Sequence, residues 1–317
     1  MGARIGIIGA GQVGAAAGYL LSATPGISQI VLVDQNEARA AGEAADIGHA
    51  AAFGTAARVS EGDYADLAGA SVVVITAGAS LKPGQTRLEL LHQNLKMTDT
   101  IIGQVLKVAP DAVLLFATNP VDVMPSIAVH RYGLPPGRAI GTGCSLDSIR
   151  FRDRLADYLG VAAPAIHAYV LGEHGDSSVP HWSSAQIAGM PVTDFAAQLG
   201  RPIDAAMQAQ ITEEVRTSAY RIKAGKGVSN FGIGGCIARL VKAIVADEQS
   251  VFAVSTCMPE LLGVRDTCVS LPHLIGARGA SAPFMPRLNA EETEALRASA
   301  ALLSSTIADG LQSLQKA

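Results

Sequence analysis

Short runs of apolar and β-branched residues alternate with helical stretches along the first half of the chain. Five runs have this character: RIGIIG (4–9), QIVLVD (29–34), SVVVITAG (71–78), AVLLFATNP (112–120) and RAIGTG (138–143). Their apolar residues are continuous instead of alternating, which is typical of strands covered by helices on both faces. The pattern predicts an α/β fold with a doubly wound parallel sheet over residues 1–143.

The pattern changes from about residue 144. Longer helical stretches are expected at 145–159, 203–224 and 234–247, with a polar-faced helix from about residue 290. The strand-like segments between them are AIHAYVLG, QSVFAVSTC and CVSLPHLI. A chain of 317 residues exceeds the usual size of a single core. We therefore expect a second, α+β domain over 144–317, packed tightly on the first because no Pro-rich linker separates them.

The motif GAGQVG (9–14) follows the first predicted strand and precedes a helical run. Gly9 permits a tight turn, Gly11 lets the backbone approach a pyrophosphate, and Gly14 allows close helix packing. Asp34 ends the second strand 20 residues after Gly14, where a carboxylate would accept ribose hydroxyls and repel a 2′-phosphate. An ordinary turn with Asp34 as a helix N-cap is the alternative. The combination favours a Rossmann domain that binds NAD.

Composition excludes several classes of partner. The net charge is −4, with 24 Lys and Arg against 28 Asp and Glu and no basic run, which argues against nucleic acid. Although 49% of residues are hydrophobic, no uninterrupted apolar run approaches the roughly 18 to 20 residues that cross a bilayer. The four cysteines are far apart and form no CxxC pair, which suggests neither a zinc site nor a disulfide framework. We therefore expect a cytoplasmic protein without a metal.

Four further stretches indicate a reaction: PGQTRLELLHQN (83–94), ATNPVD (117–122), SLDSIRFR (145–152) and LGEHGDS (171–177). Together they resemble the lactate and malate dehydrogenase superfamily, and more closely its L-lactate dehydrogenase branch. The resemblance extends from GAGQVG through SNFGIG (229–234) to the final helix. It implies an NAD-dependent L-2-hydroxyacid dehydrogenase that interconverts (S)-lactate and pyruvate.

The resemblance implies three catalytic residues. His174 would donate a proton to the oxygen on carbon 2, and Asp147 would stabilise its imidazolium, whose ordinary pKa is about 6.5. Arg87 would lie on a loop that closes over the substrate and polarises its carbonyl. A solvated loop histidine is the plain alternative. A Ser-His-Asp hydrolase using Ser177 or Ser178 is disfavoured because the chain has no G-x-S-x-G elbow.

Two residues are expected to bind the reacting part of the substrate. Arg150 follows Asp147 by three residues, on the same helical face, and its planar guanidinium suits bidentate capture of a carboxylate. Asn119 matches the family residue that hydrogen-bonds the reacting oxygen, while its backbone faces the nicotinamide ribose. A simple Asn-Pro turn is the alternative.

The expected substrate pocket departs from the family pattern at two positions. Leu81 stands where lactate enzymes usually carry Gln and malate enzymes Arg, and an oxaloacetate carboxylate facing it would lose several kcal/mol of hydration. Ser229 stands where lactate enzymes commonly have Thr, which leaves space for about one methyl group, worth about 0.8 kcal/mol. We expect pyruvate and somewhat longer apolar 2-oxo acids to react. Malate dehydrogenase is the nearest rival activity.

The resemblance also implies positions for the cofactor, for regulation and for assembly. The cofactor would contact Gly9, Gly11, Gln12, Val13, Gly14, Asp34, Tyr64, Thr76, Ala77, Gly78 and Asn119. Arg152 and His167 match positions where some bacterial members bind a sugar bisphosphate between subunits, with a plain interface or surface pair as the alternative. A homotetramer or homodimer is expected, using faces such as EAADIGHAA (43–51). A non-catalytic NAD-binding regulator is the rival from another class, but it would have lost the chemical residues that this chain keeps.

Overall fold

A nine-stranded sheet forms the centre of the protein, whose computed structural model describes residues 2–79 and 84–315. The strand order is β14-β13-β12-β6-β5-β4-β1-β2-β3. Six strands pair in parallel: β1 (Ala3–Ile8), β2 (Ile27–Val33), β3 (Arg58–Glu61), β4 (Val72–Ile75), β5 (Val113–Phe116) and β6 (Ala139–Gly141). The predicted doubly wound parallel sheet is confirmed, with β3 as a strand that the sequence pattern did not reveal.

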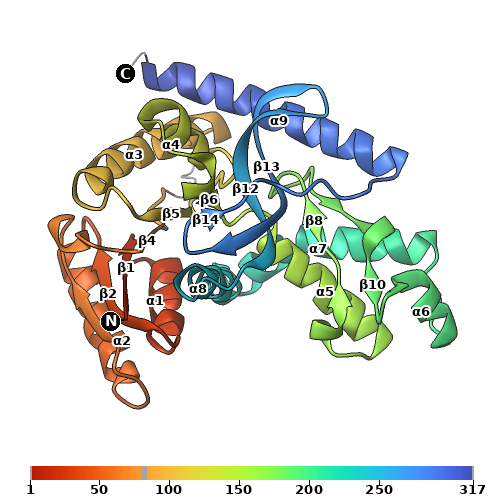
Figure 1. The fold of residues 1–317 in the computed structure, drawn as a ribbon, viewed down its shortest axis with the longest axis horizontal. Coiled ribbons are helices and arrows are strands. Elements are labelled where there is room, and N and C mark those ends of the chain that lie inside the picture. The colour runs from red at the N-terminus through yellow and green to blue at the C-terminus, as the bar shows by residue number, and fades with distance from the viewer. Residues whose placement is uncertain (1, 80–83, 316–317) are drawn as a thin grey trace.

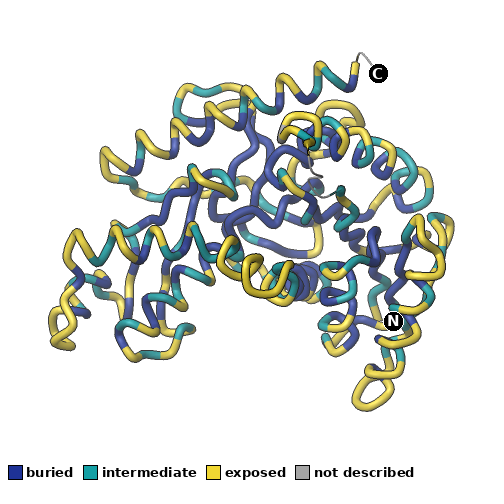
Figure 2. The backbone as a smooth tube through the Cα atoms, turned by 180° about the vertical axis from the view of Figure 1, so that it is seen from behind, coloured by how far each residue is buried: buried dark blue, intermediate teal, exposed yellow. Residues whose placement is uncertain are grey.

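Helices cover both faces of the sheet (Figure 1). They include α1 (Gln12–Ser22), α2 (Glu37–Ala51), α3 (Arg87–Val108) and α4 (Met124–Tyr132). Alternate residues of β4 enter different cores: Val72 and Val74 pack with α1, while Val73 and Ile75 pack with α3 and α4. The buried strands therefore form the middle of the molecule in Figure 2. This two-sided burial is the reason that the strand sequences are apolar without alternation.

The second half of the chain extends the same sheet. Its helices and the strands that join this sheet are α5 (Ser145–Leu159), α6 (Val192–Gln198), α7 (Ala205–Lys226), α8 (Phe231–Val245), α9 (Ala290–Gln315), β12 (Ser250–Leu261), β13 (Val264–Gly276) and β14 (Gly279–Ala280). β12 pairs antiparallel with β6 through Ser255 and Gly141. Two long strands of the second half therefore continue the sheet that the first half builds. Within the described ranges, no helix is long and apolar enough to cross a membrane.

The segment AIHAYVLG is not one strand. β7 (Ile166–His167) joins β10 (Gln186–Ile187) and β11 (Met190–Pro191), whereas β8 (Val170–Leu171) pairs with β9 (Val179–Pro180). Single 3₁₀ turns link the elements: η1 (Ala65–Leu67), η2 (Pro136–Arg138), η3 (Ala163–Ala165) and η4 (Trp182–Ser184). The expectation of one strand is wrong here, because an apolar run records burial but not the partner with which each residue pairs.

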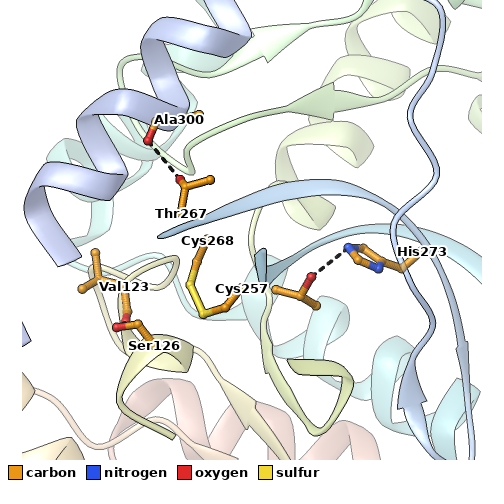
Figure 3. The surroundings of a disulfide bond; sticks show 8 residues. Val123, Ser126, Cys257, Thr267, Cys268, His273 and Ala300 are labelled. Carbon is orange, nitrogen blue, oxygen red and sulfur yellow. Dashed lines mark hydrogen bonds between the residues drawn. A yellow bond between two sulfur atoms is a disulfide. The ribbon is translucent and has the colours of Figure 1, made fainter. Parts of the chain in front are cut away.

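The structure contains a disulfide bond between Cys257 and Cys268 (Figure 3), so the expectation from cysteine spacing is wrong for this pair. The two residues stand opposite each other in the register of β12 and β13. Directly opposite residues of antiparallel strands share a face of the sheet, which brings the two sulfur atoms together. The spacing of 11 residues in sequence contains no sign of this register. Cys144 and Cys236 are free.

Candidate active site

The glycine motif forms a turn that other residues could not adopt without displacement. Gly9 has a φ of +104°, and a Cβ on it would lie 2.5 Å from the amide nitrogen of Ala77. A Cβ on Gly14 would lie 1.9 Å from the carbonyl oxygen of Gly9. The close packing that the sequence predicts at both positions is therefore present.

The first turn of α1 offers backbone donors to a ligand. Gly11 is the N-cap of α1 and provides no side-chain cap, and a Cβ built on it would meet no atom within 4 Å. The first N–H groups of a helix lack partners within the helix and attract anions. The free N–H groups at this helix start, and the space in front of Gly11, suit the pyrophosphate of a dinucleotide. Gln12 is exposed and Val13 half-buried on this turn.

Asp34 lies beside the glycine turn, at the carboxyl end of β2. Its Oδ2 accepts the backbone N–H of Ala10 at 2.7 Å, and its Oδ1 accepts that of Asn36 at 2.9 Å. The hydroxyl of Thr76 donates to the carbonyl oxygen of Gly9 at 2.8 Å. The ends of β1, β2 and β4 thus meet at one edge of the sheet, where ligands of doubly wound folds bind. These residues fit an adenine dinucleotide.

The remaining predicted cofactor positions continue along the same sheet or pack beside it. Ala77 and Gly78 follow β4, and the hydroxyl of Thr118 donates to the carbonyl oxygen of Ala77 at 2.7 Å. Tyr64 is the N-cap of η1 and packs, half-buried, against the core. Burial raises the pKa of the Tyr64 hydroxyl further above its ordinary value of about 10.

A histidine, a carboxylate and an arginine meet at the start of α5. Nδ1 of His174 lies 2.6 Å from Oδ2 of Asp147, and Nη1 of Arg150 donates to the other carboxylate oxygen at 2.9 Å. Asp147 stands in the first turn of α5 and Arg150 one turn later, which puts both on one helical face. The carboxylate is buried, whereas the imidazole retains 27% of its side-chain exposure and can meet a ligand. Three residues that the sequence selects are thus brought together.

The contact between His174 and Asp147 favours the charged form of both side chains. Burial lowers the pKa of His174, but the charge and hydrogen bond of Asp147 outweigh burial, so the net pKa is raised. Burial likewise raises the pKa of Asp147, but His174 and Arg150 reverse the effect and the net pKa is lowered. An imidazolium beside a carboxylate can supply a proton to an acceptor on its other side.

The loop that carries His174 is attached at three successive residues. Gly172 exchanges two backbone hydrogen bonds with Ser270 of β13, at 3.0 and 2.9 Å. The N–H of Glu173 donates to the hydroxyl of Ser299 in α9 at 2.8 Å, and the N–H of His174 donates to Asp122 at 2.7 Å. Sequence reasoning missed Ser299 and Asp122 as supports of this loop. Asp122 does stand at the end of the ATNPVD motif, whereas Ser299 gave no signal.

The loop that carries His174 also contains a serine whose hydroxyl is hydrogen-bonded within the loop. Ser177 donates its hydroxyl to Oε2 of Glu173 at 2.5 Å. His174 instead holds Asp147 through Nδ1. The hydroxyl of Ser177 is therefore directed to a carboxylate four residues earlier, which does not favour a Ser-His-Asp hydrolase.

Asn119 lies just beyond β5, with an exposed side chain, at a cis peptide bond to Pro120. The buried amide of Asn94 donates to the carbonyl oxygen of Asn119 at 3.0 Å and accepts the N–H of Ala79 at 2.8 Å. Asn94 therefore joins the segments that follow β4 and β5. Sequence reasoning missed this role, although Asn94 ends the quoted stretch PGQTRLELLHQN.

Three other predicted site residues differ in how fully the structure describes them. Leu81 lies outside the described residues. Arg87 is the first residue of α3 and lies between Thr86 and Glu89, which form the capping box of this helix; its side chain is outside the described part. Ser229 is half-buried shortly before α8.

Of the predicted anion pair, Arg152 lies in α5 and His167 ends β7. Arg152 donates through Nε to the carbonyl oxygen of Ala168 at 2.8 Å, and its guanidinium covers the ring of Tyr169 at 4.9 Å. His167, next to Ala168, is exposed. Arg152 is therefore attached to the backbone that immediately follows His167.

Two family models match consecutive parts of this chain. A family model for the lactate/malate dehydrogenase NAD binding domain matches residues 3–141, and one for the lactate/malate dehydrogenase alpha/beta C-terminal domain matches residues 144–314. The chain belongs to the lactate/malate dehydrogenase family. The expected Rossmann fold, NAD cofactor and oxidoreductase class are confirmed.

Individual relatives match this chain over almost its whole length. An L-lactate dehydrogenase from Thermus aquaticus is 48% identical over 300 residues, which cover 95% of this chain and 97% of the relative. One from Allorhizobium ampelinum is 46% identical over the same shares of the two chains. The solved structure of the minor L-lactate dehydrogenase from Enterococcus mundtii superposes with a TM-score of 0.93 at 31% identity, over 97% of this chain and 98% of the other.

Proposed function

We propose that this family member interconverts (S)-lactate and pyruvate with NAD as its cofactor. The observation that carries the proposal is the hydrogen-bonded arrangement of His174, Asp147 and Arg150, which combines a proton donor with a carboxylate binder. The relatives described above, which are L-lactate dehydrogenases, support the same substrate.

Proton transfer is assigned to His174. Because Nδ1 holds Asp147, Nε2 is the ring nitrogen that faces the substrate and delivers a proton to the oxygen on carbon 2. NADH, when bound, would supply the hydride that carbon 2 of pyruvate needs, so that hydride and proton together would give (S)-lactate and NAD⁺. In the opposite direction the neutral imidazole removes the hydroxyl proton. Asp147 keeps the ring oriented and stabilises its positive charge in both directions.

The substrate is held and polarised by three further side chains. Arg150 shares Nη1 with Asp147, and its planar fork has further N–H donors for the substrate carboxylate. Asn119 hydrogen-bonds the reacting oxygen. Arg87 stabilises the charge that develops on that oxygen and, at the start of α3, belongs to the segment that closes over the substrate.

The cofactor is assigned to the glycine turn and its neighbours. Gly9, Gly11 and Gly14 shape the turn, and the exposed start of α1 receives the pyrophosphate. Asp34 accepts the ribose hydroxyls, and its charge repels the 2′-phosphate of NADP. Gln12, Val13, Tyr64, Thr76, Ala77 and Gly78 complete the proposed cofactor contacts.

Leu81 and Ser229 are proposed to set substrate preference. A leucine facing the substrate side chain disfavours oxaloacetate, whose second carboxylate would lose hydration without meeting a cation. Serine in place of the more common threonine leaves space for about one extra methyl group, worth about 0.8 kcal/mol. We therefore propose a preference for pyruvate that extends to 2-oxobutyrate and branched 2-oxo acids.

A substrate panel tests this proposal. The oxidation of NADH is followed by absorbance with pyruvate, 2-oxobutyrate, 2-oxoisocaproate and oxaloacetate, and kcat/KM is compared. We expect pyruvate and 2-oxobutyrate to lead and oxaloacetate to be at least about tenfold poorer. His174→Ala should abolish turnover while NADH still binds. A kcat/KM tenfold higher for oxaloacetate than for pyruvate would instead indicate a malate dehydrogenase. NADH binding without turnover of any acid would indicate a non-catalytic NAD-binding regulator.

Three broader proposals follow from the family. The substrate domain comprises residues 144–317 and packs on an NAD domain of residues 1–143, and the protein forms a homotetramer or homodimer. Arg152 and His167 form an anion site between subunits, which fructose bisphosphate titration would test. Each proposal is independent of the catalytic assignment.

We also propose a cytoplasmic location. Disulfides are rare in the reducing cytoplasm, so this location predicts that Cys257 and Cys268 are thiols in intact cells. Alkylation before lysis, followed by mass spectrometry, measures their state. Recovery of both residues mainly as a disulfide would count against the location.

A further inference from the structure

Asp122 is a buried carboxylate to which the reaction above assigns no role. It stands three residues after Asn119 and is 2% exposed. Its Oδ2 accepts the backbone N–H of His174 at 2.7 Å, and its Oδ1 lies 3.5 Å from the hydroxyl of Ser270. One buried side chain therefore joins the turn after β5 to the loop that carries the proposed proton donor.

Burying a carboxylate at this position costs free energy. Burial raises the pKa of Asp122 to about 6, against the opposing influence of the His174 charge and backbone N–H. The carbonyl of an asparagine could accept the same N–H without the cost of burying a charge. Anchoring of the loop alone therefore does not explain why the residue is ionisable.

We propose that Asp122 is a positioning residue for proton transfer: its hydrogen bond fixes His174 relative to Asn119, and its negative charge favours the imidazolium. This inference rests on the proposed function. The two residues that it connects are those assigned to the same substrate oxygen, one as proton donor and one as hydrogen-bond donor. A shift of the loop by a fraction of an ångström would alter both contacts with that oxygen.

Charges around the imidazole support the electrostatic part. His174 faces the Asp147 carboxylate, which raises the imidazole pKa most strongly, and Arg150, which lowers it. Asp122 is a second carboxylate that raises it. The negative charge of Asp122 thereby offsets part of the effect of Arg150 and favours the protonated ring.

The surroundings of Asp122 itself contain few other charges among the described residues. Glu173, the neighbour of His174 in the same loop, raises the pKa of Asp122 through its negative charge. The thiol of Cys144 at the start of α5 is neutral, because burial raises its pKa well above the ordinary value. From β13 the facing group is the neutral hydroxyl of Ser270. The charge of His174 is therefore the main favourable partner of Asp122.

Two variants and one control separate position from charge. Asp122→Asn keeps an acceptor but removes the charge, and Asp122→Ala removes both. Ser299→Ala is the matched control, since it removes the acceptor of the neighbouring Glu173 N–H without changing a charge. For each protein we would measure kcat and KM for pyruvate against pH, the Kd of NADH and the Tm. The imidazole pKa is measured by NMR with ¹³C-labelled histidine, and the His174 signal is assigned with His174→Asn.

The expected results differ among the variants. Asp122→Asn should lower the His174 pKa by at least about half a unit. The basic limb of kcat/KM should move to lower pH by the same amount. At pH values above the pKa this corresponds to a roughly threefold smaller fraction of imidazolium. Asp122→Ala should in addition lower kcat about tenfold or more, with the Kd of NADH within about threefold of the original value. Ser299→Ala should lower the Tm and leave the titration of His174 in place.

Three outcomes would overturn the proposal. An unchanged His174 pKa in Asp122→Asn would exclude the electrostatic role. An equal shift of the His174 pKa in Ser299→Ala would show that the shift comes from loss of loop anchoring and not from the charge of Asp122. An unchanged kcat in Asp122→Ala would exclude positioning. If Asp122→Ala does not fold, the asparagine variant decides. If the unaltered protein reduces no 2-oxo acid, the proposed function fails, while the NMR titration still measures the effect of Asp122 on the ring.

Discussion

His174 and Asp147 are 27 residues apart in sequence, yet the imidazole Nδ1 lies 2.6 Å from the carboxylate Oδ2. The contact joins the loop after β8 to the first turn of α5. The carboxylate raises the pKa of His174 despite the opposing effect of burial. This long-range contact therefore favours the protonated imidazole on which the proposed reaction depends.

Asp147→Asn should displace the pH profile of pyruvate reduction. Reduction needs the imidazolium, so kcat/KM is full below the His174 pKa and falls as pH rises through it. Without the carboxylate charge, burial dominates and lowers that pKa. We expect the basic limb to move to lower pH by about one to two units, which reduces kcat/KM at pH 8 by about 10- to 100-fold. NADH affinity is the control and should change little. A profile that stays in place would contradict the assigned dyad.

Asp122→Asn should stabilise the fold at neutral pH even as it impairs the reaction. The folded-state pKa of Asp122 is raised from 3.8 to about 6, so the folded protein binds the proton more tightly than the unfolded chain. This carboxyl therefore contributes its greatest stability below about pH 4 and loses about 3 kcal/mol as pH rises through about 6. Removing the ionisable group should raise the Tm at pH 7.5 more than at pH 5. Calorimetry at both pH values measures this, and a Tm lowered more at pH 7.5 would contradict it.

Replacing Cys257 and Cys268 together by alanine should weaken the fold. The bond closes a loop between residues that are 11 apart, and the chain-entropy relation assigns about 3 kcal/mol to a loop of that length. Denaturant unfolding of the oxidised protein and the double variant measures the difference. The reductant dithiothreitol is the control, since it should destabilise the original protein and leave the variant unaffected. Equal midpoints under oxidising conditions would show that the disulfide contributes nothing to stability.

Alanine at Gly11 and at Gly14 should have separable effects. A Cβ at residue 11 meets no atom within 4 Å, whereas one at residue 14 lies 1.9 Å from the carbonyl oxygen of Gly9. Gly11→Ala should therefore leave the Tm within about 2 °C but weaken NADH binding about tenfold or more, since the methyl group obstructs the phosphates. Gly14→Ala should lower the Tm as well. Fluorescence titration and thermal unfolding measure both quantities, and unaltered NADH affinity in Gly11→Ala would count against the pyrophosphate site.

Local pattern in the sequence was sufficient for much of the fold and for part of the site. Continuous apolar runs predicted the strands of the parallel sheet, because burial on both faces leaves a direct record in residue type. The helix expected over residues 145–159 is α5. The glycine turn and Asp34 were predictable for the same reason, since backbone conformation and spacing along two adjacent strands are local properties.

Contacts between distant segments were decided by the tertiary structure. The support of His174 by Asp122 spans 52 residues, and that of Glu173 by Ser299 spans 126. The pairing of Cys257 with Cys268 depends on the register of one hairpin. Each contact requires the packing of whole strands and helices against one another, and a one-dimensional pattern of residue types records burial without recording the partner.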